Sequence, residues 1–94
     1  MKGHLYRVTV EHLEDAKGNA REAAPLTFQT RNHDDLFPIV EKMRARGLFD
    51  ADEAAALAIG LKLFGEVMLQ HREHELFAPL RPHFVEFIKR LKKS

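Results

Sequence analysis

The sequence predicts an α+β domain in which an antiparallel hairpin of two β-strands packs against three α-helices, in the order β-β-α-α-α. Two observations carry this prediction. The hydrophobic period is two residues near the N-terminus and changes once, to the helical period, at about residue 32. Capping and turn residues then divide the remainder into three helical segments. We expect residues 1–94 to form one domain, with the hairpin at 3–31 and the helical part at 32–94.

The N-terminal part alternates as a half-buried strand does. In HLYRVTVEHL, the residues Tyr6, Val8 and Val10 alternate with polar side chains. A second alternating run, LTFQTR, follows a charged stretch in which Gly18 and Asn19 are the turn formers. Two such runs most simply pair as an antiparallel hairpin. Their connection is longer than a tight turn, so the pattern leaves the register open.

The first helix is predicted to start near residue 32. Asn32 and Asp34 are candidate N-caps, because their side chains can accept hydrogen bonds from the first free backbone N–H groups. Pro38 is tolerated only in the first turn, where its missing N–H has no partner. Gly47 is predicted to end this helix in the left-handed conformation.

A second helix is predicted at about 51–72, because Asp50 and Glu53 form a D-x-x-E capping box ahead of strong helix formers. Two prolines then interrupt regular helix in the segment HREHELFAPLRP. A third helix is predicted at about 82–92. We expect it to bury four apolar residues at spacings of three and four, namely Phe84, Phe87, Ile88 and Leu91.

The composition excludes several kinds of site. The chain has no cysteine, which rules out disulfides, a thiolate nucleophile and Cys-based zinc or iron–sulfur sites. Between residues 31 and 93 there is no Ser, Thr, Cys or Tyr, so this stretch also lacks a hydroxyl nucleophile. The net charge of +1 creates no strong field toward nucleic acid or an anionic membrane. We expect a non-enzymatic protein with no cofactor, located in the cytoplasm because no signal sequence is visible.

Three histidines near the end of the second helix are the candidate metal ligands. His71 and His74 lie on the apolar side of a helical wheel, if the helix continues through residue 74. We therefore interpret both as packing residues with one ring nitrogen hydrogen-bonded. The alternative is a small-ligand or metal site, possibly catalytic, that His83 helps to complete. The segment HREHE matches neither H-E-x-x-H nor H-x-x-E-H.

Small side chains line one side of the second helix. Ala54, Ala58 and Gly65 fall within about 40° of one another on the helical wheel. We interpret this seam as the place where a facing helix of the same chain packs closely. The alternative is a subunit contact, which Ile59 and Leu69 favour because they project from the otherwise polar side. The predicted interface residues are therefore Ile59, Leu69, Ala58 and Gly65.

The end of the chain is basic. Residues 81–94 carry five basic side chains, namely Arg81, Lys89, Arg90, Lys92 and Lys93, against Glu86 alone. Cations at a helix C-terminus complement the helix macrodipole, which explains the pattern without a ligand. A weaker alternative is nucleic-acid binding through this helix. Its phenylalanines share the apolar face, however, and are better interpreted as core than as base-stacking platforms.

Two stretches carry a resemblance to a known family. They are KGHLYRVTVEHL and DADEAAALAIGLKLFGEVMLQHREHELFAPLRPHFVEFIKRLKK, of which GLKLFGEVMLQHR and LFAPLRPHFVEFIKRLK are the most specific parts. The chain resembles a family of small bacterial proteins known as a domain of unknown function. The resemblance implies a bacterial cytoplasmic protein, complete within residues 1–94, and it transfers no catalytic residue.

The remaining hypothesis for function is binding. A small core, unpaired strand edges and the missing nucleophile all favour a non-enzymatic protein-interaction module that forms a homodimer. A further, unidentified protein partner is compatible with this prediction, whereas a membrane partner is not expected. The alternative remains the His71, His74 and His83 site described above.

Overall fold

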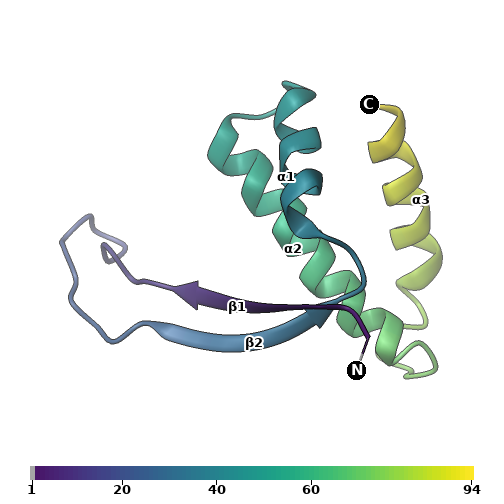
Figure 1. Cartoon of the computed structure of the whole chain (residues 1–94), viewed down its shortest axis with the longest axis horizontal. Helices are drawn as coiled ribbons and strands as arrows, with labels where there is room; N and C mark the ends of the chain where they lie inside the picture. Colours follow the sequence, from purple (N-terminus) through teal and green to yellow (C-terminus); the bar gives the residue numbers. More distant parts are fainter. Residues whose placement is uncertain (1) are drawn as a thin grey trace. The chain divides into compact units, whose positions relative to one another are not determined.

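The computed structural model describes residues 2–94, which form two strands followed by three helices (Figure 1). These elements are β1 (His4–Val10), β2 (Leu26–Asn32), α1 (Leu36–Ala45), α2 (Ala51–Gln70) and α3 (Arg81–Lys93). The predicted α+β class and element order are confirmed. The chain divides between Asp34 and Asp35 into two compact units, one containing the hairpin and one containing the helices. No helix in the described part of the chain combines the length and the apolar character needed to cross a membrane.

The hairpin has an apolar face and a mainly polar face. β1 and β2 pair antiparallel without a bulge, from His4 opposite Asn32 to Val10 opposite Leu26. Because directly opposite residues project to the same side, the register gathers the apolar side chains on one face, except that of Leu5. That face carries Tyr6, Val8, Val10, Leu26 and Phe28. The other face carries mainly polar side chains, among them Arg7, Thr9, Thr27 and Gln29.

The connection between the strands is ordered around the Asp15 carboxylate. Its Oδ1 atom accepts hydrogen bonds from the backbone N–H groups of Lys17 and Asn19, both at 2.9 Å. Gly18 supplies the left-handed backbone of this turn, with φ +86°. Hydrogen bonds from the Asn19 and Lys17 backbone lower the pKa of Asp15, because they stabilise its charged form.

The first helix starts later than predicted. Its N-cap is Asp35, whose side chain accepts a hydrogen bond from the backbone N–H two residues later at 3.1 Å. Asn32 instead ends β2, and its Oδ1 atom accepts from the backbone N–H of Asp34 at 3.0 Å. The two candidates predicted from the sequence, Asn32 and Asp34, are therefore both wrong, and the cap lies one residue beyond Asp34. Pro38 does lie in the first turn, and Gly47 is left-handed with φ +69°, as predicted.

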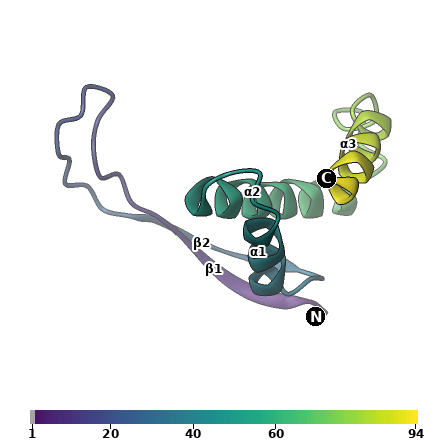
Figure 2. The ribbon, with the colours of Figure 1, turned by 90° about the horizontal axis from the view of Figure 1, so that it is seen from above.

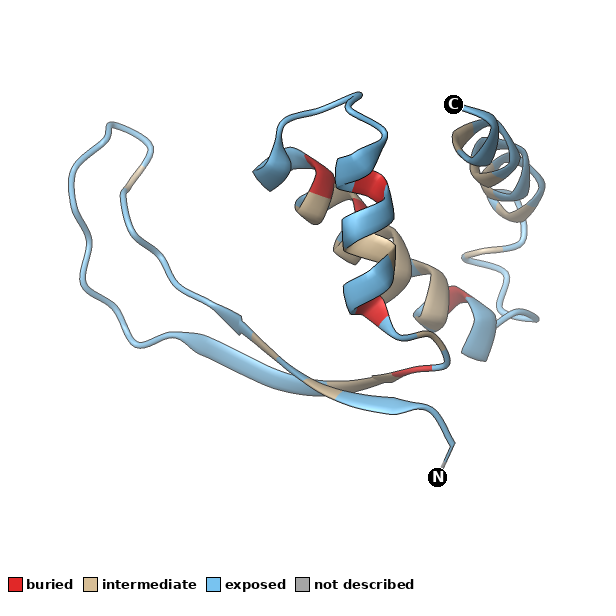
Figure 3. Cartoon of the chain, turned by 45° about the horizontal axis from the view of Figure 1, so that its top comes forward, coloured by how far each residue is buried: buried red, intermediate tan, exposed pale blue. Residues whose placement is uncertain are grey.

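α1 and α2 form the core of the helical unit and lie side by side (Figures 1 and 2). Met43 of α1 packs with Ala54 and Ala58 of α2, which are 0% and 2% exposed. Half-buried apolar side chains surround this cluster, namely Ile39, Val40, Leu57 and Leu91. The two alanines bring a facing helix of the same chain close, as the small-residue seam predicted. Figure 3 shows buried segments, coloured red, on both α1 and α2.

The start of α2 follows the sequence signal. Asp50 is the N-cap, and its Oδ1 atom accepts a hydrogen bond from the backbone N–H of Glu53 at 2.8 Å. This bond satisfies one of the free N–H groups that every helix start presents. The predicted start at residue 51 is therefore confirmed.

α3 is held to the rest of its unit by a narrow set of contacts. The rings of Phe84 and Phe64 meet at a centroid distance of 5.7 Å, and Leu91 packs against the α1–α2 core. The guanidinium of Arg46, which follows α1, donates hydrogen bonds to the backbone carbonyls of Leu91 and Ser94. No residue of α3 is fully buried (Figure 3).

One predicted core residue of α3 is not buried. Phe87 is 45% exposed, whereas Phe84, Ile88 and Leu91 are half-buried. These three residues follow one another at spacings of four and three, which is a narrow stripe along the helix. Phe87 lies beside that stripe, so the prediction that all four are buried is wrong for this residue.

Replacing Asp50 by Ala should lower the free energy of unfolding by about 1 kcal/mol, because the backbone N–H of Glu53 loses its acceptor. Asp50→Ser is the matched control, since serine is an N-cap of similar strength. Denaturant unfolding followed by circular dichroism measures both variants. Equal destabilisation by alanine and by serine would contradict the capping role.

Acidification should loosen the turn around Asp15. Its pKa lies below the ordinary value of 3.8 in the folded protein, so the order that the carboxylate imposes is present above that value. This order is lost as the pH falls through the lowered folded-state pKa. The amide chemical shifts of Lys17 and Asn19 report the transition during a pH titration. Asp15→Asn should show no such transition, and an apparent pKa above 3.8 in the unmodified protein would contradict the assignment.

Candidate functional site

The three candidate histidines are all exposed. α2 ends at Gln70, and His71 is its C-cap, with φ −123° and ψ 39° outside the helical region. The interpretation of His71 and His74 as packed residues is therefore wrong. It relied on extending the helical wheel through residue 74, and the wheel has no meaning beyond the point where the helix ends.

His74 stabilises the turn that follows α2. Its Nδ1 atom accepts a hydrogen bond from the backbone N–H of Leu76 at 3.0 Å, and its ring meets the ring of Phe77 at 6.2 Å. His83 lies in the first turn of α3. Among residues 2–94, no three His, Cys, Asp or Glu side chains gather as metal ligands would. The histidine-centred alternative thus finds no supporting geometry.

The four predicted interface residues differ in what they expose. Ala58 belongs to the α1–α2 core, and a Cβ added at Gly65 would lie 3.6 Å from the ring of Phe84 in the same chain. Ile59 is half-buried, whereas Leu69 is 48% exposed. Ala58 therefore has almost no surface to offer a second subunit. A subunit contact through Ile59 and Leu69 stays a prediction.

Three of the five apolar residues on the apolar face of the hairpin are exposed. Along it, Val10, Leu26 and Phe28 are 51%, 63% and 42% exposed. Leu13, just beyond β1, is 71% exposed. The unit that contains the hairpin has a single layer, so it offers no second layer of its own to cover this face.

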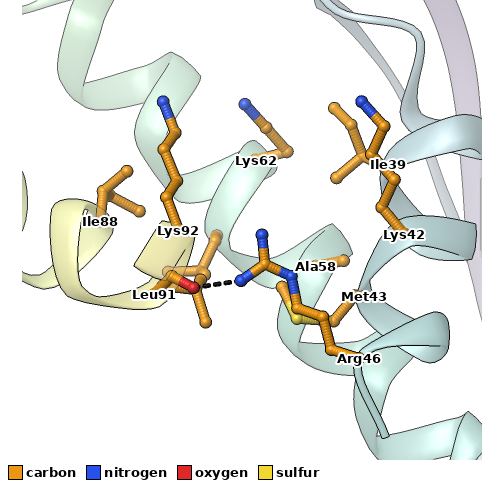
Figure 4. Close-up of a pocket in the computed structure, with 10 residues that line it drawn as sticks. Ile39, Lys42, Met43, Arg46, Ala58, Lys62, Ile88, Leu91 and Lys92 are labelled. Atoms are coloured by element: carbon orange, nitrogen blue, oxygen red, sulfur yellow. Dashed lines mark hydrogen bonds between the residues drawn. The ribbon is translucent and has the colours of Figure 1, made fainter. Parts of the chain in front are cut away.

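A groove of about 360 Å³ opens between α1, α2 and α3 (Figure 4). Its apolar lining consists of Ile39, Met43, Ala58, Leu61, Ile88 and Leu91. Its polar lining is entirely basic and consists of Lys42, Arg46, Lys62 and Lys92. Each of the three helices contributes apolar side chains and one lysine. Arg46 comes from the residue that follows the end of α1. The groove thus combines apolar walls with a positive rim.

The basic groups of the groove have different partners. Arg46 is engaged with the carbonyls of Leu91 and Ser94. Lys62 interacts with other groups of the protein. The side chains of Lys42 and Lys92 make no hydrogen bond or ion pair within residues 2–94.

The sequence analysis did not identify this groove. Lys92 was interpreted as a complement to the helix macrodipole, and neither Lys42 nor Lys62 was considered as a binding residue. The available signal was that each helix carries a lysine beside its apolar stripe. The three lysines indicate a common site only once the arrangement of the helices around one another is known.

Comparison with known proteins gives a family and a fold. The family model described as a domain of unknown function with a solved structure, DUF3861, matches residues 4–93. The crystal structure of a protein of unknown function from Pectobacterium atrosepticum is 38% identical, with a TM-score of 0.84, and the match covers 98% of this chain and 99% of that chain. No curated protein is significantly similar. The resemblance seen in the sequence is therefore confirmed, and this chain belongs to the DUF3861 family.

Proposed function

We propose that this protein is a non-enzymatic interaction module that forms a homodimer through the apolar face of its hairpin. The observation that carries the proposal is the exposure of Val10, Leu26 and Phe28 on one side of a two-stranded sheet. A two-stranded hairpin is marginally stable in water unless its apolar face is covered. A second copy supplies a cover of matching shape and chemistry.

The energetic gain from such a contact is substantial. Burial of a Leu, Val or Phe side chain contributes about 1.5–3 kcal/mol relative to its exposed state. A dimer with two-fold symmetry buries the same residues twice, once on each copy. Two hairpins that pack face to face also form the two-layer arrangement that sheets normally adopt.

The remaining parts of the proposal rest on the sequence and the family. The helical part has no Ser, Thr, Cys or Tyr between residues 31 and 93, which supports a binding rather than a catalytic role. The relative from Pectobacterium atrosepticum supports a bacterial origin. A cytoplasmic location belongs to the proposal as well.

Leu26→Lys should weaken the dimer about a hundredfold. Each dimer loses two buried leucines, and about 1.5 kcal/mol for each copy corresponds to that factor. Thr27→Lys is the matched control, because it adds the same charge to the neighbouring exposed residue on the other face. Sedimentation equilibrium measures the dissociation constant of each variant, and circular dichroism verifies that both are folded.

Two outcomes would refute the hairpin dimer. The first is a strictly monomeric unmodified protein at high micromolar concentration. The second is a dimer that Leu26→Lys and Thr27→Lys weaken to the same extent, because such a dimer would use another surface.

A further inference from the structure

We propose that the groove between α1, α2 and α3 binds a medium-chain fatty carboxylate, with the alkyl chain on the apolar walls and the head group at Lys42 and Lys92. The groove and the apolar face of the hairpin have no residue in common. This inference therefore stands independently of the proposed dimer.

The walls suit a single alkyl chain. Ile39, Leu61 and Ile88 come from three different helices, and all are half-buried beside the core. The volume of about 360 Å³ lies at the lower end of the range for small-molecule sites, about 300–1,000 Å³. No hydroxyl, amide or carboxylate side chain lines the groove, so the walls offer a ligand apolar contact alone. Each buried CH₂ group contributes about 0.8 kcal/mol to binding.

The rim selects for negative charge. Figure 4 shows the ammonium groups of three lysines, each carried by a different helix, on the same side of Leu91, Ala58 and Met43; they are Lys42, Lys62 and Lys92. Lys42 and Lys92 have no partner within residues 2–94, so a ligand anion displaces no existing ion pair at either of them. A cationic head group would be repelled at the same rim, because no carboxylate lines it.

Arg46 has a positioning role at this groove. Its guanidinium donates to the carbonyls of Leu91 and Ser94 and so fixes the last turn of α3 beside the end of α1. Lys92 stands in that turn. The bond from Arg46 thus holds one of the two lysines at the rim, while α1 itself carries Lys42.

A single-chain ligand explains the geometry better than a partner helix. A docking helix requires an apolar stripe that extends over several turns of the receiving surface. The apolar walls here instead lie between three helices, and the three lysine ammonium groups lie on one side in the view of Figure 4. One chain with one anionic end satisfies both features at once.

Isothermal titration calorimetry of the full chain with sodium decanoate, below its critical micelle concentration, tests the site. The expected result is saturable binding of one decanoate per chain. Decyltrimethylammonium and decanol carry the same chain with a cationic and a neutral head. Both should bind at least tenfold more weakly than decanoate, because they gain no attraction at the lysine rim.

Variants locate the head group. Lys42→Gln and Lys92→Gln should each weaken decanoate about fivefold, the factor that corresponds to an exposed charge pair of about 1 kcal/mol. Lys89→Gln is the matched control, because Lys89 is an exposed lysine of α3 that does not line the groove. It should leave the affinity unchanged. All three substitutions are at exposed positions, and unfolding curves verify equal stability.

Any of three results would overturn this inference. The first is the absence of saturable decanoate binding by the unmodified protein. The second is an affinity that falls equally in Lys89→Gln and in the two rim variants. The third is decyltrimethylammonium binding as tight as that of decanoate, which would show an apolar site with no selection for charge.

Discussion

The contact between α1 and α2 is the constraint on which the helical unit depends. Met43 packs on Ala54 and Ala58, whose small side chains let the two helix backbones approach closely. This contact sets the distance between the side chains that flank it, including Lys42 on α1 and Lys62 on α2. The apolar walls and the basic rim of the groove are therefore consequences of the same packing. A larger side chain at Ala58 would therefore separate α1 from α2 and would also widen the groove.

The sequence predicted the elements well where a local signal was sufficient. Asp50 marked the start of α2 within one turn, and Gly47 marked the end of α1, because both act through the backbone beside them. Adjacent candidates were harder to separate. Asn32 and Asp34 were both candidate caps for α1, but the N-cap is Asp35, and its position depends on where β2 stops, as Asn32 in the last position of β2 shows.

The candidate site was less predictable because its geometry is tertiary. The helical wheel would place His71 and His74 on the apolar side only if the helix continued through residue 74. α2 ends at Gln70, and the hydrophobic period of the sequence does not indicate that end. The groove was missed for a related reason. Lys42 and Lys92 are far apart in the sequence, and Lys92 had a sufficient local explanation, so only the packing of α3 beside α1 reveals that both residues line one groove.

The marginal attachment of α3 has a consequence for the energetics of the native state. With no fully buried residue, the helix contributes little to the cooperative core, and its detachment exposes mainly the half-buried side chains of Phe84, Ile88 and Leu91. Partial opening of this segment therefore costs far less free energy than global unfolding. Amide hydrogen exchange along α3 then proceeds through such sub-global openings, whereas exchange at the centre of α2 follows the complete loss of structure.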